Sequence, residues 1–315
     1  MDFVISFITL GIPFSTALLL AALGETVNQR AGIFNLGCEG IMAMGAFVGM
    51  LVPFSIGGSA ELPLYMNLLG LAAAAITGAV MGLLFGVVVI TFGAPQGIAG
   101  IGLQLFGTGL AGTLFRHFVG GSRGIAGIKD IAIPLLCDIP VLGKMLFRCN
   151  PLVYFAFLMV PVTHFILFKT PWGLRIRACG TTPRAADSLG IGVSRTRFQA
   201  LAFGGAMAGL AGAYLSVCQA KMFTDTLISG RGFIAVALVY FGHWQPVRVM
   251  LGALLFSLAQ SLQIAVQTYG LATFPYEFLV MLPYALVIVV LIFVRGSARL
   301  GPAMLGKPFN REMRV

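Results

Sequence analysis

Two polar side chains in an otherwise apolar stretch of the sequence could bind a polar ligand. Asn35 and Glu39 are four positions apart, so on a helix they would share one face. A carboxylate accepts hydrogen bonds and a carboxamide both accepts and donates them, which suits hydroxyl and N–H groups. Because a carboxylate is costly at the centre of a lipid bilayer, Glu39 is expected to face a wet cavity or a polar partner.

A structural role would explain the same pair without a ligand, because the two side chains could instead cap or brace a broken helix. Aromatic faces for a flat ligand are available from Phe34, or from Phe233 in the second half of the chain. The second-half positions that correspond to the polar pair, Ile234 and Leu238, are apolar. The first half is therefore expected to carry most of the polar character of a ligand path.

The sequence shows no pattern for other site chemistry. It contains no G-x-x-x-x-G-K-[ST] phosphate loop, no Ser/His/Asp arrangement and no HExxH motif. The five cysteines form no CxxC pair and the three histidines are isolated, so no metal site and no bound cofactor are expected. No nucleic-acid-binding signature accompanies the net charge of +10. If the protein needs ATP, another subunit must hydrolyse it.

The composition predicts a polytopic membrane protein. Of 315 residues, 58% are hydrophobic and 10% are charged, against about 25% charged in a soluble domain. With a mean hydropathy of +0.97, such a chain cannot cover its surface with polar groups. This excludes an ordinary soluble enzyme, a disordered protein and a secreted disulfide scaffold. We expect an all-α membrane helix bundle that forms a single domain over residues 1–315.

About nine hydrophobic segments can be distinguished, and two of them are unusual. Residues 33–53 open with polar residues and glycines, and residues 230–243 are too short to cross a bilayer alone. Both are predicted to be broken or re-entrant helices, which are tolerated where they line a cavity or are buried in protein. The segments are approximately 3–23, 33–53, 64–91, 98–115, 151–168, 198–220, 230–243, 249–268 and 277–295.

The distribution of charge predicts the orientation. Loop 169–197 carries six Lys or Arg residues and one Asp, and the tail 296–315, with Arg295 before it, carries five basic residues and one Glu. Both are expected to be cytoplasmic. Counting segments backwards places the N-terminus outside, and loop 116–150 is then external although it holds five basic residues. The C-terminus is predicted to be cytoplasmic.

A faint internal repeat supports a transporter. Arg30–Asn35 resembles Ser229–Ile234, and each stretch follows a span, opens a glycine-rich helix and precedes two further spans. In the predicted topology the two units, about 1–115 and 198–295, run in opposite directions. Inverted repeats of this kind are common in transporters, whose ligand site lies near the repeat interface.

A short helix is predicted inside the basic loop. Pro183 suits a first helical position, Thr182 is a possible N-cap, and Gly190 would end about two turns that start at Arg184. The simpler alternative is a basic loop without a partner.

Three stretches resemble a known family. Gly24–Ala46 (GETVNQRAGIFNLGCEGIMAMGA) resembles the N-terminal signature of permease subunits of bacterial ABC importers. Within that group it is most similar to the nucleoside and simple-sugar branch, which is related to the branched-chain amino acid permeases. Residues 177–190 and 230–242 resemble the coupling loop and the second-half signature. The similarity covers nearly the whole chain, with the motifs in the expected order.

The resemblance implies a pore-forming subunit without ATPase activity, in the bacterial inner membrane, that moves a nucleoside or simple sugar by alternating access. It would work among membrane lipids with a second permease, homologous or identical, with cytoplasmic ATPases that use ATP and Mg²⁺, and with an external substrate-binding protein. The short helix would dock on the ATPase. Relatives often carry Glu-Asn before the proline, where this chain has Thr181–Thr182. The implied coupling residues are Thr182, Pro183, Arg184, Ala185, Ala186 and Gly190.

Two further hypotheses remain open at this stage. The chain could be an ion-coupled secondary transporter that uses Glu39, and ATP-dependence of uptake separates this alternative from an ABC importer. Cys137 and Cys149 would share an oxidising compartment in the external loop and could form a disulfide, or could remain two free thiols.

Overall fold

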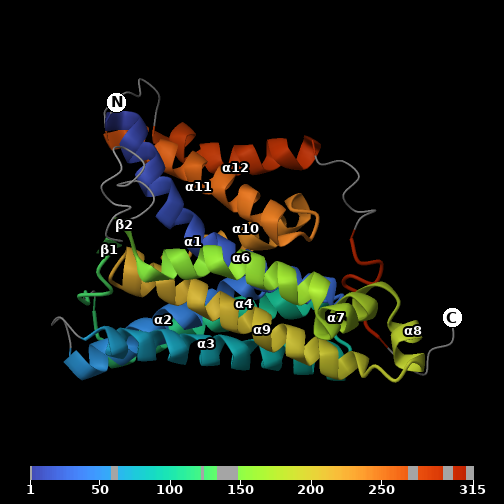
Figure 1. The fold of residues 1–315 in the computed structure, drawn as a ribbon. Helices are drawn as coiled ribbons and strands as arrows, with labels where there is room; N and C mark the ends of the chain where they lie inside the picture. Colours follow the sequence, from blue (N-terminus) through green and yellow to red (C-terminus); the bar gives the residue numbers. More distant parts are fainter. Residues whose placement is uncertain are drawn as a thin grey trace.

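The computed structural model describes residues 2–57, 63–121, 124–132, 148–268, 276–293 and 301–309. Almost all regular structure in these residues is helical (Figure 1), apart from two-residue strands β1 (Ile131–Ala132) and β2 (Arg148–Cys149), which pair antiparallel. The helices are α1 (Asp2–Arg30), α2 (Cys38–Gly57), α3 (Leu64–Gly86), α4 (Gln96–Phe118), α6 (Pro151–Lys169), α7 (Pro171–Thr181), α8 (Pro183–Ser188), α9 (Val193–Ala213), α10 (Arg231–Phe241), α11 (Pro246–Thr268) and α12 (Tyr276–Phe293), with π-helical turns η1 (Val87–Thr91) and η2 (Tyr214–Gln219).

The predicted bundle of membrane helices is confirmed, but the count of nine spans is not. Among the described residues, seven helices are long and apolar enough to cross a membrane: Phe7–Arg30, Cys38–Gly57, Leu64–Thr91, Gln96–Phe118, Pro151–Lys169, Val193–Gln219 and Pro246–Thr268.

The two segments predicted to be broken are interrupted at their starts. Residues 31–37 are not helical, and α2 begins only at Cys38. In the second half α10 has 11 residues, which is too short for a span of about 20 residues. The chain enters α10 at Gly230, whose φ of 81° lies in the left-handed region that favours glycine.

The halves of the chain interlock in a reciprocal way. Helix α1 of the first half packs against α11 of the second, and α9 of the second half packs against α3 of the first. In each case the first long helix of one half lies on the third helix of the other. Two repeats related by symmetry would produce this pair of equivalent helix contacts. The inverted repeat itself stays a prediction.

Small residues let α3 and α9 approach closely. A Cβ placed on Gly209 of α9 would overlap the carbonyl oxygen of Ala74, and one on Gly78 of α3 would overlap that of Gly205. Helices in lipid gain little from the hydrophobic effect, so close backbone packing of this kind holds them together.

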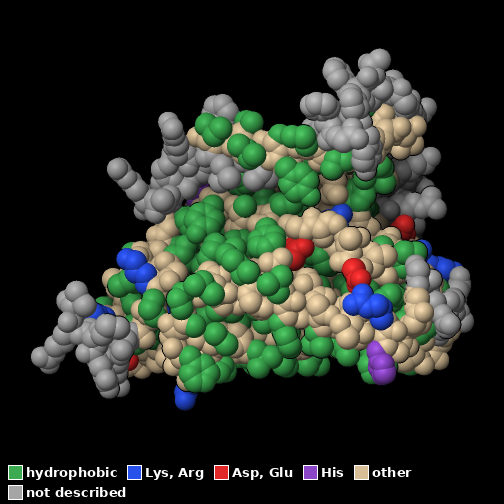
Figure 2. All heavy atoms as spheres, turned by 180° about the vertical axis from the view of Figure 1, so that it is seen from behind, with side chains coloured by type: hydrophobic (Ala, Val, Ile, Leu, Met, Phe, Trp, Pro, Cys, Tyr) green, Lys and Arg blue, Asp and Glu red, His purple; other side chains and the backbone are tan. Residues whose placement is uncertain are grey.

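The basic segments gather at one end of the bundle, where Figure 1 shows α7, α8 and the C-terminus. There the Met304 N–H donates to the carbonyl of Gly180 at 3.0 Å, and the Gly306 N–H donates to that of Gly32 at 3.2 Å. Figure 2, seen from behind, shows hydrophobic side chains over the middle of the molecule and most of the visible Lys and Arg toward its two ends. Helices α7 and α8 and residues 301–309 therefore lie at the same end of the bundle, and the side of the membrane that this end faces stays a prediction.

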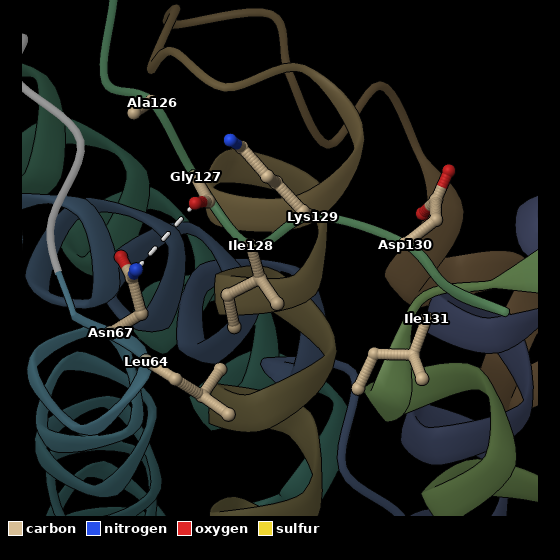
Figure 3. Close-up of a pocket in the computed structure, with 8 residues that line it drawn as sticks. All are labelled: Leu64, Asn67, Ala126, Gly127, Ile128, Lys129, Asp130 and Ile131. Carbon is tan, nitrogen blue, oxygen red and sulfur yellow. Dashed lines mark hydrogen bonds between the residues drawn. The ribbon is translucent and has the colours of Figure 1, made fainter.

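The described part of loop 116–150 packs on the opposite end. Ile125 donates its N–H to the Lys221 carbonyl at 2.8 Å, and Ile128 is buried. A hollow of about 270 Å³ separates residues 126–131 from the start of α3, where the Asn67 amide lies 3.5 Å from the Gly127 oxygen (Figure 3). Cys149 is buried in β2, but Cys137 lies outside the described residues, so their pairing stays a prediction.

We expect Gly209→Ala to destabilise the protein, because the added Cβ must push α3 and α9 apart at a cost of about 1–3 kcal/mol. Gly109→Ala in α4 is the matched control, since nothing lies within 4 Å of its Cβ position. Both variants gain the same helix propensity, about 1 kcal/mol. Thermal unfolding of the purified protein in detergent should give a lower midpoint for Gly209→Ala, and equal midpoints would contradict the close packing.

Candidate functional site

Glu39 joins the two halves of the chain by capping α10. Its Oε1 accepts the Gly230 N–H and its Oε2 accepts the Gly232 N–H, both at 2.7 Å. The first N–H groups of a helix have no partner within the helix, and the helix dipole favours negative charge at this end. The carboxylate is only 6% exposed. Glu39 from α2 therefore supplies, across the bundle, the cap that α10 lacks in its own sequence.

The backbone of the two halves is in direct contact at this cap. A Cβ on Gly232 would lie 2.5 Å from both the Cα and the N of Glu39. A side chain at position 232 would therefore push α2 and α10 apart and draw the carboxylate away from the amides.

Asn35 precedes α2 and does not share a helical face with Glu39. Because α2 begins at Cys38, Asn35 lies outside the helix, and the expectation of a shared face is wrong. Its Oδ1 accepts the Gly37 N–H at 2.9 Å, which forms a local turn ahead of the helix. Its backbone N–H donates to Glu25 Oε1 at 3.0 Å.

Glu25 organises the end of α1, a role that the sequence analysis did not assign. Its carboxylate accepts from Asn28 Nδ2 at 2.9 Å and from Gln29 Nε2 at 3.2 Å, in addition to the backbone of Asn35. Residues three and four positions apart lie on one face of a helix. The contact of Glu25 with Asn28 and Gln29 could therefore have been predicted from their spacing in the sequence.

The turn beyond α10 is also held by the first half. Trp244, which is 1% exposed, donates its indole N–H to Gln29 Oε1 at 2.8 Å. Arg30 Nε donates to the Trp244 carbonyl at 3.1 Å. Together with the cap from Glu39, these bonds tie both ends of α10 to the first half.

The four residues predicted for a substrate path make separate contacts in the part of the chain that the structure describes. Phe34 donates its backbone N–H to Gln96 Oε1 at 2.7 Å, and its ring meets Tyr240 edge to face at 6.3 Å. Phe233, in the first turn of α10, is 37% exposed. The Asn35 Oδ1 and both carboxylate oxygens of Glu39 accept backbone N–H groups. This geometry supports the bracing alternative, and a contact of the four with substrate stays a prediction.

The short helix in the basic loop forms where it was predicted. Helix α8 spans Pro183–Ser188, Thr182 occupies the N-cap position, and Gly190 has a φ of 80°. The Thr182 side chain makes no capping hydrogen bond; its carbonyl accepts the Ala186 N–H at 3.0 Å instead. Helix α7 was not predicted.

Two of the predicted coupling residues are buried. Arg184, Ala185 and Gly190 are exposed, whereas Pro183 is buried. Ala186 is 2% exposed and belongs to a buried cluster with Cys179 and Val193. The surface that α8 offers is therefore built from its exposed positions, and it extends to Leu189, which is 80% exposed.

Comparison with known proteins finds similarity to permease components of transporters. A family model described as branched-chain amino acid transport system / permease component matches residues 7–291. The guanosine ABC transporter permease protein NupQ of Bacillus subtilis is 36% identical over 96% of this chain and 95% of its own. A putative glucose ABC transporter permease of Haloferax volcanii is 34% identical over 99% and 100%. A second guanosine permease of Bacillus subtilis, NupP, is 25% identical over 76% of this chain and 68% of its own. No solved structure matches.

We expect Glu39→Gln to destabilise the protein by about 1–3 kcal/mol, because a carboxamide offers one acceptor oxygen and its NH₂ meets a backbone N–H. Asp225→Asn is the matched control. Asp225 pairs with Arg116 at 2.8 Å, but its side chain is 57% exposed, so that ion pair contributes little.

Thermal unfolding and complex assembly of both variants test the cap. The Glu39 variant should unfold at a lower temperature, and the Asp225 variant should resemble the wild type. A Glu39→Gln protein of normal stability that has lost transport would contradict the bracing role and favour direct contact with substrate.

Proposed function

The chain belongs to the branched-chain amino acid transport system permease family, and from this premise we propose that it conducts a nucleoside or a simple sugar through an ABC importer. One observation carries the proposal. Over nearly its full length the chain is 34–36% identical to permeases named for guanosine and for glucose. Both compounds carry several hydroxyl groups, and the described helices form a multi-pass membrane bundle around a broken helix at the contact of the two halves.

The energy would come from partner ATPases that bind ATP and Mg²⁺, since this sequence holds no phosphate loop. The partner would dock at the end of the bundle that carries α7 and α8, where Arg184, Ala185 and Leu189 are exposed. Movement of α8 would drive alternating access. We place this end in the cytoplasm and the N-terminus outside, in the cytoplasmic membrane of a bacterium, with the external binding protein at the opposite end.

The second permease would be a homologous chain rather than an identical copy. Bacillus subtilis has two permeases that are both named for guanosine, and this chain matches one at 36% identity and the other at 25%. The weaker match covers only 68% of its own length. A pair of unequal permeases therefore supports a heteromeric pore.

Ion coupling through Glu39 is less well supported. Protonation of a carboxylate oxygen makes it a donor and weakens the hydrogen bonds that it accepts. Both oxygens of Glu39 accept backbone N–H groups of α10. Release of either would leave a buried donor without a partner, at a cost of about 1–3 kcal/mol.

Uptake into proteoliposomes tests the proposed function. The vesicles should contain this chain with the second permease, the ATPase and the binding protein. We expect ATP-dependent uptake of a nucleoside or sugar from a panel that also includes amino acids, and no effect of ionophores. Uptake that needs no ATP and follows an ion gradient would overturn the ABC assignment, and uptake of amino acids alone would overturn the substrate class.

Cross-linking tests the docking surface. In the assembled complex Ala185→Cys should cross-link to the ATPase, whereas Ala186→Cys, the buried neighbour, should not. Two of the native thiols should add little background, because burial raises the pKa of Cys179 and raises that of Cys149 to about 11. Labelling of Ala185→Cys by an impermeant reagent applied outside the cell would show that the topology is inverted.

A further inference from the structure

Two hollows meet where α10 begins. The first, of about 120 Å³, lies between the start of α10 and helices α11 and α12. The second, of about 330 Å³, lies between η2 and the segment that leads to α10. Ser229 and Arg231 line both of them. The two hollows therefore adjoin at these two side chains.

Polar and apolar side chains together line both hollows. Arg231, Gln260, Gln263 and Tyr284 line the first, together with Ser229. The second is lined by Gln219, Thr224 and Thr226 in addition to the shared pair. Among the side chains that the structure describes, no Asp or Glu lines either hollow. Intramembrane polar groups are costly and usually mark a substrate or ion pathway.

Two acceptor oxygens in these walls have no partner among the described residues. They are Oε1 of Gln260 in the first hollow and Oε1 of Gln219 in the second, and both atoms are buried. A buried acceptor without a donor is unfavourable. A ligand hydroxyl group in the hollow would supply the missing donor once the glutamine side chain turns its oxygen toward it.

Arg231 is positioned by the cap that Glu39 provides. The two amides bound by Glu39, those of Gly230 and Gly232, stand on either side of Arg231 in the chain. The guanidinium donates through Nη1 to the Leu227 carbonyl at 2.7 Å. Because a guanidinium has five N–H donors, others remain for a ligand.

These groups define the chemistry of the ligand. The guanidinium, the amide groups and the hydroxyl groups of the described lining can each form a hydrogen bond with a neutral ring that carries several hydroxyl groups. Phe256 and Ile234 add an apolar wall that can contact the C–H face of such a ring. The second hollow falls within the range of about 300–1,000 Å³ that ligand sites usually have, and the first is smaller.

We propose that Arg231 is the centre of a polar site that contacts the hydroxylated ring of the substrate as it crosses the permease. Gln219 contributes to this site on one side of Arg231, and Gln260 and Gln263 contribute on the other. The assignment rests on the proposed function and adds which half of the chain contacts the substrate. The first-half residues Glu39 and Asn35 hold the helix ends, and the second half supplies the hydrogen bonds.

Uptake by reconstituted complexes containing Gln260→Leu or Gln263→Leu tests the assignment. Leucine is similar in size to glutamine but makes no hydrogen bond, so we expect uptake per assembled complex to fall about 10-fold, which corresponds to about 1.4 kcal/mol. Discrimination between the substrate and its deoxy analogue should fall as well, and a purely structural defect would not produce this change. Gln267→Leu is the matched control: it lies on the same helix and its Nε2 is also buried without a partner, but it lines neither hollow.

The outcomes separate this assignment from the proposed function. Normal uptake and normal discrimination in both variants, in a complex whose wild type transports, would overturn the assignment alone. An equal loss in Gln267→Leu would overturn it too, because the effect would then belong to the packing of α11. A wild-type complex that takes up none of the nucleosides and sugars would overturn the proposed function, and the assignment with it.

Discussion

The structure depends on one interaction, the contact of the Glu39 carboxylate with the start of α10. A helix that begins inside a membrane protein exposes N–H groups to a medium that cannot satisfy them. Here one carboxylate from the other half of the chain accepts two of them at 2.7 Å. The bond therefore allows the membrane helix to be broken at this point, and it fixes α2 and α10 relative to each other. Without it, the polar residues around Arg231 would have no fixed position.

The opposite end of α10 connects this centre to the basic end of the bundle. Gln29 and Arg30 hold Trp244, and Arg197 Nε donates to the carbonyl of Ala31 at 3.2 Å. Residues 301–309 run through the same region, and Phe309 packs on the cluster that buries Ala186 of α8. A partner that displaces α8 would therefore also shift the end of α1 and, through Trp244, α10. This chain of contacts gives a physical route by which events at the ATPase could reach the substrate path.

Local signals in the sequence were sufficient for part of this description. Pro183 and Gly190 define α8 because both act on the backbone within one or two turns, and the apolar segments define the spans because a bilayer demands them. Glu39 stood out because charge is rare in such a chain. Its partners could not be predicted, since they lie 191 and 193 positions away and bind through the backbone, which leaves no pattern of side chains. The burial of Ala186 depends likewise on a distant residue, Phe309. The first hollow arises when α10, α11 and α12 come together, and the second when η2 packs beside the segment that leads to α10.

The most direct test of the account is a high-resolution structure of the assembled importer with substrate held in the permease. The account predicts that Glu39 remains on the amides of Gly230 and Gly232 while the hydroxyl groups of the substrate contact Arg231 and Gln260. A carboxylate of Glu39 that has left α10 and binds the substrate directly would contradict it.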